Sequence, residues 1–254
     1  ESLFFLKKSM LPQFHLPKKK RVYKGGNRSH TLVICLLCKD NLNKSMKLYT
    51  APTGNGRKPL IFLHILDVPN EIHMFDWPTK EIKENWYLEL NPHGLVPTLV
   101  DGDVTLCESN AILQYLADNY DTENKFSYPS TDPLYWQQLR WLFYQSTQFS
   151  DALSRLFFYK KFRSDDQWLV DKGFEQIGKV YQVLDSHLAQ RKWFVGDKFT
   201  IADLAFAVGH FRRIEKTTGT KFEIENFEEK YPHVTQWYND VLSIEGIKEG
   251  FELK

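Results

Sequence analysis

The sequence predicts an α/β domain followed by an all-helical domain, an α/β plus all-α organisation within one chain of 254 residues. Three observations support this prediction. Between residues 46 and 120, short apolar segments of strand length alternate with segments of helical period. From Pro133 onward, apolar residues recur only at helical spacing. The intervening residues 121–132 are polar and rich in turn formers, which is typical of a linker.

The first part opens with a strand, a turn and a helix. Residues 47–50 have the pattern of a short strand, and residues 51–56 that of a turn. An apolar helical face then extends over residues 60–66. Because Pro59 lacks an N–H and is tolerated only in the first turn of a helix, we expect this helix to begin close to Pro59.

The pattern continues with a second strand over residues 71–75 and a looser helix over residues 79–90. Two short strands, 97–100 and 104–106, flank a tight Asp-Gly-Asp turn and form a hairpin. A helix over residues 108–119 follows. In this order the first two strands can pair in parallel through a right-handed crossover, and the hairpin adds two more strands.

One helix start in the second part is marked by its own side chains. The segment Thr200-Ile201-Ala202-Asp203 has the spacing of a capping box. In this motif the Thr200 hydroxyl accepts a hydrogen bond from the amide of Asp203, and the carboxylate of Asp203 accepts one in return. We therefore expect a buried helix that begins here.

Charge is distributed unevenly along the chain. The 33 Lys and Arg residues nearly balance the 32 Asp and Glu residues, and a net charge of +1 argues against a dedicated nucleic-acid binder. Residues 1–45 hold ten basic and two acidic residues, a net of +8, which leaves −7 for the rest. Since residues 1–45 also show no sustained period, we interpret them as a flexible basic arm.

Composition excludes several classes of protein. A hydrophobic fraction of 42% is enough for sizeable cores, so the chain as a whole is not disordered. The longest uninterrupted apolar run, residues 32–38, has seven residues, whereas a membrane span needs about 20. The three cysteines argue against a disulfide scaffold and favour a reducing compartment. These features predict a cytoplasmic protein that does not bind membranes.

Two features of the arm have alternative interpretations. Residues 17–22, Pro-Lys-Lys-Lys-Arg-Val, resemble a nuclear import signal, which would add a nuclear location if the arm is native. A solvated charge run is the simpler interpretation. Cys35 and Cys38 have the spacing of a redox or metal pair, but they precede the α/β domain and few further ligands lie nearby. We assign them no role and expect no metal site.

Four motifs, and their order along the chain, resemble those of the glutathione transferase superfamily. Three of them are Asn-Pro-His-Gly-Leu-Val-Pro at 91–97, Glu-Ser-Asn-Ala-Ile at 108–112 and Phe-Thr-Ile-Ala-Asp at 199–203. The fourth, Ala-Pro-Thr-Gly-Asn-Gly at 51–56, resembles the branch that holds bacterial nu-class enzymes and fungal relatives of the yeast nitrogen-regulating prion protein. The resemblance extends from Met46 to the C-terminus.

The resemblance implies the glutathione transferase fold. A thioredoxin-like glutathione-binding domain would span residues 46–120, after the arm 1–45, and a linker, 121–132, would lead to an all-helical domain over 133–254. It also implies a homodimer, glutathione as co-substrate and no permanently bound cofactor. The second substrate would be a small electrophile, conjugated in detoxification, or a disulfide that is reduced. The alternative is a non-enzymatic binding or regulatory module with the same fold.

The turn at 51–56 holds the candidate catalytic residues. In an α/β sheet, ligands collect where strands end and helix N-termini point at them. Thr53 and Asn55 offer a hydroxyl and an amide at this place, and the resemblance favours Asn55, with Thr53, as the group that stabilises a glutathione thiolate. Ordinary turn and cap chemistry is the alternative for both. Tyr49 is a competitor for the catalytic role, although a sheet residue facing the core is the better interpretation of it.

Two further segments are candidates for holding glutathione. The residue before a proline is forced into an extended conformation, so Val96 can present its N–H and C=O to a peptide. In the family, Pro97 is cis and the residue before it pairs with the cysteinyl part of glutathione. Ser109 and the helix amides suit a carboxylate, and Glu108 suits an ammonium, so together they can hold the γ-glutamyl end. Helix capping is the alternative for this pair.

The sequence departs from the family pattern at two contacts. Ile82 and Leu95 stand where relatives carry polar or basic residues, so weaker glutathione binding is expected. The helix after the linker would form a wall of the pocket for the second substrate, and four aromatic residues are candidates to line it, with helical core as the alternative for each. They are Tyr144, Phe149, Phe157 and Phe158.

Overall fold

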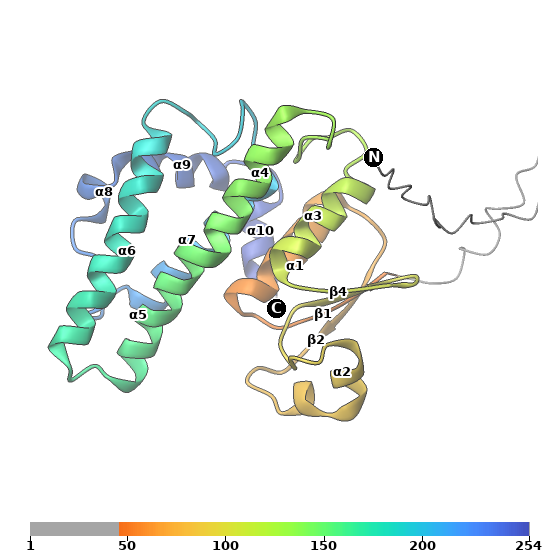
Figure 1. Ribbon diagram of the computed structural model, residues 1–254, viewed down its shortest axis with the longest axis horizontal. Coiled ribbons are helices and arrows are strands. Elements are labelled where there is room, and N and C mark those ends of the chain that lie inside the picture. Colours follow the sequence, from red (N-terminus) through yellow and green to blue (C-terminus); the bar gives the residue numbers. More distant parts are fainter. Residues whose placement is uncertain (1–45, 254) are drawn as a thin grey trace, which may run out of the picture. The chain divides into compact units, whose positions relative to one another are not determined.

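The computed structural model describes residues 46–253, and Figure 1 shows them in colour. Residues 1–45 lie outside the described part of the chain, and with them the predicted arm, the basic run and the Cys35–Cys38 pair. The described residues form one unit by their internal contacts. None of the helices in the described part is long and apolar enough to cross a membrane.

The first part of the chain contains a four-stranded mixed sheet in the order β2-β1-β3-β4. β1 pairs in parallel with β2, and antiparallel with β3, which in turn pairs antiparallel with β4. This is the predicted crossover followed by the predicted hairpin. The strands are β1 (Lys47–Thr50), β2 (Glu71–Met74), β3 (Thr98–Asp101) and β4 (Val104–Cys107).

Helices cover both faces of this sheet (Figure 1). The helices α1 (Gly54–Leu66) and α3 (Ser109–Tyr120) pack against each other and share the main core with Leu48 of β1. The short helix α2 (Asn85–Leu90) covers the other face, where a second small core forms around Phe75 and Tyr87. Alternation along β1 explains the division, because successive side chains of a strand point to opposite faces.

The helix α1 begins five residues earlier than the sequence predicted. Pro59, which we expected in the first turn, lies inside the helix. Thr53 caps the helix, since its Oγ1 accepts a hydrogen bond from the N–H of Gly56 at 3.0 Å. A proline at this depth removes the N–H that would reach the carbonyl of Asn55. The cap and the packing of α1 outweigh that loss.

The looser helix predicted over residues 79–90 is interrupted. Residues Glu81–Lys83 form one turn of 3-10 helix, and α2 starts only at Asn85. Glu84 between them is extended, with ψ of 150°. Ile82 and Tyr87 both reach the same small core, at 5% and 0% exposure. Burial of these two side chains therefore takes precedence over continuous helix.

The second part is entirely helical, as predicted, and it is built around α7 (Ile201–Thr217), whose residues 201–210 are all buried. Thr200 and Asp203 form the predicted capping box at its start. The π-helix Gln145–Phe149 joins α4 to α5 without a break in the helical path. The other helices are α4 (Pro133–Tyr144), α5 (Ser150–Phe162), α6 (Gln167–Leu188), α8 (Phe227–Lys230), α9 (Pro232–Leu242) and α10 (Ile247–Glu252).

Candidate active site

The turn between β1 and α1 is held in one shape by its glycine. The Thr50 hydroxyl donates to the carbonyl of Gly56 at 2.8 Å, and a Cβ on Gly56 would lie only 2.2 Å from the carbonyl oxygen of Ala51. No other residue type fits there without moving the backbone. The turn thereby presents Thr53 and Asn55 at the N-terminus of a 13-residue helix.

Thr53 and Asn55 differ in what they have available. The Thr53 oxygen already accepts from Gly56 N–H, although its own hydroxyl hydrogen is free to donate. Asn55 is the second residue of α1, and its side chain is exposed without a hydrogen-bond partner among residues 46–253. Its amide therefore remains an unused donor beside the positive end of the α1 dipole.

Two adjoining cavities meet at Asn55. The first, which we call the α7 cavity, measures about 320 Å³ and lies between the start of α1, α5 and α7. Its lining residues include Thr53, Asn55, Lys58, Val96, Phe157 and Arg212. The second, which we call the α3 cavity, measures about 600 Å³ and lies between α1, α3 and α4. Its lining residues include Asn55, Lys58, Glu108, Ser109, Leu142 and Phe143. Asn55, Lys58 and Ser150 line both, so the candidate residues gather in one region of the molecule around two adjoining cavities.

The predicted peptide-holding residues lie on opposite sides of this region. The Val96–Pro97 peptide bond is cis, as the resemblance implied. Val96 lines the α7 cavity, and its N–H and C=O make no hydrogen bond within the described residues. Pro97 itself is buried and does not line either cavity. Its place in the site is to set the direction of Val96.

Glu108 and Ser109 form one wall of the α3 cavity. Glu108 has φ of 70°, a left-handed conformation that costs a residue with a side chain about 1–3 kcal/mol. Its carboxylate is exposed and does not cap α3. Ser109 begins α3 and is only 6% exposed. The strained backbone thus directs an acidic side chain and a helix N-terminus into the same cavity.

Lys58 is a site residue that the sequence did not reveal. It is 2% exposed, and its Nζ donates to Gln145 Oε1 at 2.8 Å, Asn110 Oδ1 at 3.0 Å and Ser109 Oγ at 3.3 Å. Burial lowers the pKa of Lys58 to about 7, although the carboxylate of Glu108 opposes this change. The amine links α1, α3 and the π-helix beneath the region where the two cavities meet. The available signal was a pair of basic residues, Arg57 and Lys58, directly before the apolar segment of α1.

Of the four aromatic residues expected to line the pocket for the second substrate, only one lines the α7 cavity. Phe157 lines the α7 cavity. Phe149 is fully buried in the main core, Phe158 is 53% exposed, and Tyr144 packs on Trp141, so these three do not line this cavity. Helical periodicity placed the four residues on helices without showing which face of each helix turns toward the site.

The competing residue Tyr49 faces the small core of the first part. Its ring lies 5.8 Å from that of Trp86 and 6.0 Å from that of Tyr87, between ring centres. It does not line either cavity. Ile82, at one of the two departures from the family pattern, is also buried there, whereas Leu95 at the other is 56% exposed beside Val96.

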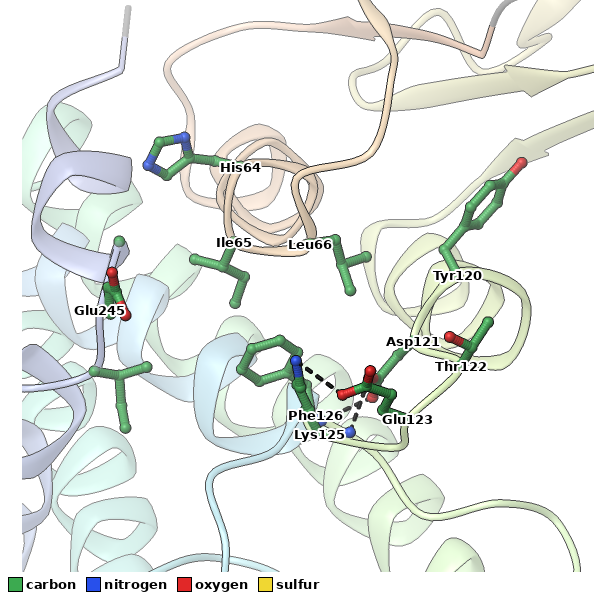
Figure 2. A pocket seen from close by; sticks show the side chains of 12 residues that line it. His64, Ile65, Leu66, Tyr120, Asp121, Thr122, Glu123, Lys125, Phe126 and Glu245 are labelled. Carbon is green, nitrogen blue, oxygen red and sulfur yellow. Dashed lines mark hydrogen bonds and ion pairs between the residues drawn. The ribbon is translucent and has the colours of Figure 1, made fainter.

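A larger cavity of about 670 Å³ lies away from these residues, between the C-terminal end of α1, the segment 120–126 and residues 244–246 (Figure 2). Three of its charged side chains are already engaged: Lys125 pairs with Glu123 at 2.9 Å, and the Asp121 carboxylate accepts from the backbone N–H groups of Lys125 and Phe126. Asp121 therefore shapes the linker, and size alone does not make this cavity the site. None of the sequence-predicted site residues lines it.

Comparison with known proteins identifies the family. The family model for the N-terminal domain of glutathione S-transferase matches residues 55–119, and that for the C-terminal domain matches residues 141–245. Glutathione S-transferase 1 of Schizosaccharomyces pombe is 34% identical over 212 residues, which cover 78% of this chain and 91% of that protein.

Solved structures agree with the family models. A glutathione S-transferase-like protein of Lodderomyces elongisporus is 42% identical with a TM-score of 0.74, covering 83% of this chain and 96% of that one. The glutathione transferase URE2P6 of Phanerochaete chrysosporium, solved with oxidized glutathione, is 29% identical with a TM-score of 0.76, covering 83% and 96%. These likenesses cover both parts of the described chain and include the branch that the motifs indicated. The chain belongs to the glutathione S-transferase family.

Proposed function

We propose that this chain is a glutathione-dependent transferase in which Asn55, assisted by Thr53, stabilises the thiolate of bound glutathione. The observation that carries the proposal is the amide of Asn55, which has no partner within residues 46–253 and is exposed where the α7 and α3 cavities adjoin at the N-terminus of α1. A developing thiolate placed there receives a hydrogen bond and the field of the helix dipole.

The size of this effect matches what thiol activation requires. A thiol with a pKa near 8.5 is only about 3% ionised at neutral pH. Lowering the pKa by two units requires about 2.7 kcal/mol of preferential stabilisation of the thiolate. A hydrogen bond to a charged group contributes about 1.5–3 kcal/mol, and the dipole adds about 0.3–1 kcal/mol. A donor at Asn55 therefore suffices without a general base.

The remaining candidates would hold the peptide. The N–H and C=O of Val96, which make no hydrogen bond in the described part of the chain, suit the cysteinyl part of glutathione in the α7 cavity. Ser109 and the amides of α3 suit the γ-glutamyl carboxylate, and Glu108 suits the γ-glutamyl ammonium, in the α3 cavity. Lys58 donates a hydrogen bond to the Ser109 hydroxyl and holds that side chain in place. The thiol would then fall between these two anchors, close to Asn55.

A parallel assay with two second substrates tests the function. The purified protein is given glutathione with a chloronitrobenzene or with a mixed disulfide. We expect saturable turnover of at least one of them and retention of the protein on immobilised glutathione. Conjugation of the first would make the enzyme a detoxifying transferase, and reduction of the second a disulfide reductase. Absence of both turnover and retention would contradict the proposal and favour a non-enzymatic module.

The homodimer is also a proposal, and α4 supplies its support. Trp136 and Phe143 on this helix are 64% and 67% exposed, and Phe143 continues into the apolar wall of the α3 cavity. Exposed aromatic residues next to an apolar groove are typical of interface anchors. We propose that a second copy of the chain covers this face.

Replacing Phe143 by glutamate is expected to weaken the dimer by about 30-fold, because hot-spot residues contribute about 2 kcal/mol or more. Light scattering across a micromolar concentration series measures the change. Phe162→Glu is the matched control, since Phe162 is 59% exposed on α5. A wild-type monomer at these concentrations, or equal effects of the two variants, would contradict the proposed interface.

We further propose a cytoplasmic enzyme whose two domains divide at residues 121–132. The low cysteine count supports the location. The segment 121–132 contains turns but neither helix nor strand, which supports the boundary. A nuclear location would depend on residues 17–22, outside the described part of the chain.

A further inference from the structure

The α7 cavity has a one-sided charge. Its ionisable lining residues, Lys58 and Arg212, are both basic, and no acidic side chain lines it among the described residues. The rest of its wall is apolar or neutral, including Trp77 and Phe157. A cavity of this composition attracts anionic molecules and does not favour cations.

Arg212 lies where it can act on a substrate that reacts near Asn55. A Cβ added to Gly54, the residue before Asn55, would lie 3.6 Å from Arg212 Cγ, so the stem of Arg212 packs against the first turn of α1. The side chain is 21% exposed. Its charge is therefore only partly screened by solvent at the cavity wall.

The positive charge of Arg212 is not fully compensated. Its Nη1 donates to Glu215 Oε2, but the same oxygen also accepts from Arg57 Nη1 at 3.3 Å. Although burial opposes ionisation, the hydrogen bond and charge of Arg212, with the charge of Arg57, keep the pKa of Glu215 below its usual value. One carboxylate thus serves two guanidinium groups, and the other nitrogens of Arg212 have no partner among residues 46–253.

We propose that Arg212 makes this site select second substrates that carry a carboxylate close to their electrophilic atom. A guanidinium binds a carboxylate through two parallel hydrogen bonds, which fixes orientation as well as charge. This inference rests on the proposed function, because it requires that the electrophile occupy the α7 cavity beside the activated thiol. It names the chemical class of substrate that the composition of the cavity fits.

The test compares two chloronitroaromatic probes, neutral 1-chloro-2,4-dinitrobenzene and anionic 4-chloro-3,5-dinitrobenzoate. In both reactions the thiolate sulfur forms a bond to the ring carbon, chloride leaves with the bonding electrons, and the thiol proton passes to solvent. For each probe, kcat/KM of a variant is divided by that of the wild type, so the intrinsic reactivities cancel. KM for glutathione is measured with the neutral probe.

Arg212→Gln is expected to lower kcat/KM about tenfold for the anionic probe and less than twofold for the neutral one. Arg155→Gln is the matched control, because Arg155 also pairs with a carboxylate one turn away, Asp151, but lies exposed on α5 outside the cavity. It should leave both ratios unchanged. Glu215→Gln removes the shared carboxylate and should shift the preference toward the anionic probe, which tests the inference even if Arg212→Gln folds poorly.

Two results would overturn the inference. Equal losses for both probes would show that Arg212 acts through the structure of α7. A raised KM for glutathione with an unchanged probe preference would show that Arg212 holds a carboxylate of glutathione itself. Calorimetric binding of the two glutathionyl conjugates gives the same comparison without turnover. A retained preference for the anionic conjugate in a protein without turnover would support the inference and overturn only the proposed catalysis.

Discussion

Asp203→Ala is expected to lower the free energy of unfolding by about 4 kcal/mol, because it leaves several buried donors without an acceptor. The Asp203 carboxylate is fully buried and accepts from Trp237 Nε1 at 2.9 Å, Phe194 N–H at 3.0 Å and Thr200 N–H at 2.9 Å. It thereby ties the start of α7 to α9 and to the segment before α7. Urea denaturation followed by far-ultraviolet circular dichroism measures the change.

Asp132→Ala is the matched control for this prediction. Asp132 is also a helix cap, accepting from the N–H of Leu134 at 2.8 Å, but it is only half-buried, and within residues 46–253 its carboxylate accepts from no second helix. Its loss should cost about 1 kcal/mol. Equal destabilisation by the two variants would mean that Asp203 acts as an ordinary cap, and the network account of it would be wrong.

Asn55→Ala is expected to lower kcat/KM for glutathione about 30-fold, whichever second substrate is turned over. The estimate follows from removing one hydrogen bond to a charged group, worth about 2 kcal/mol. The fold should be retained, because the Asn55 side chain is exposed and makes no hydrogen bond within the described residues. Steady-state kinetics with saturating second substrate isolates the step that depends on glutathione.

Two further variants separate catalysis from structure. Asn119→Ala is the matched control, since Asn119 is an exposed asparagine on α3, away from both cavities, and should leave kcat/KM unchanged. Thr53→Ala removes the cap of α1 and should cost about 1 kcal/mol of stability. If Thr53→Ala lowered turnover more than Asn55→Ala did, Thr53 would be the main donor to the thiolate.

Much of the fold could be predicted because its signals are local. The spacing of Thr200 and Asp203 marks the start of α7, and the order of short apolar segments gives the mixed sheet. The motif at residues 91–97 also has a local structural role. Asn91 Nδ2 donates to the carbonyl of Leu95 at 2.7 Å, and the Tyr87 hydroxyl donates to the same carbonyl at 2.6 Å, which fixes the loop before Val96.

Pro59 shows where local rules fail. A proline inside a helix costs about 3 kcal/mol or more, so a prediction from sequence places it in the first turn. In the folded chain, the cap at Thr53 and the buried face of α1, which includes Leu60 and Ile61, outweigh that cost. Tertiary packing is not visible in a local pattern, and the start of this helix was therefore predicted too late.

The two basic residues of the site were missed for a related reason. Lys58 and Arg212 have long side chains, and the position of the charged group depends on which neighbours the stem packs against. Asn55 and Ser109, in contrast, have short side chains whose position follows from the helix N-termini that carry them. Motifs at helix starts are accordingly better predictors of a site than charges in helix interiors.

The measurement that tests the central claim most directly is the pKa of the thiol of bound glutathione, followed through the ultraviolet absorbance of the thiolate. In the wild type we expect a value about two units below that of the free thiol, and in Asn55→Ala a value at least one unit higher than in the wild type. An unshifted thiol pKa in the wild type, or equal values in the two proteins, would contradict activation by Asn55.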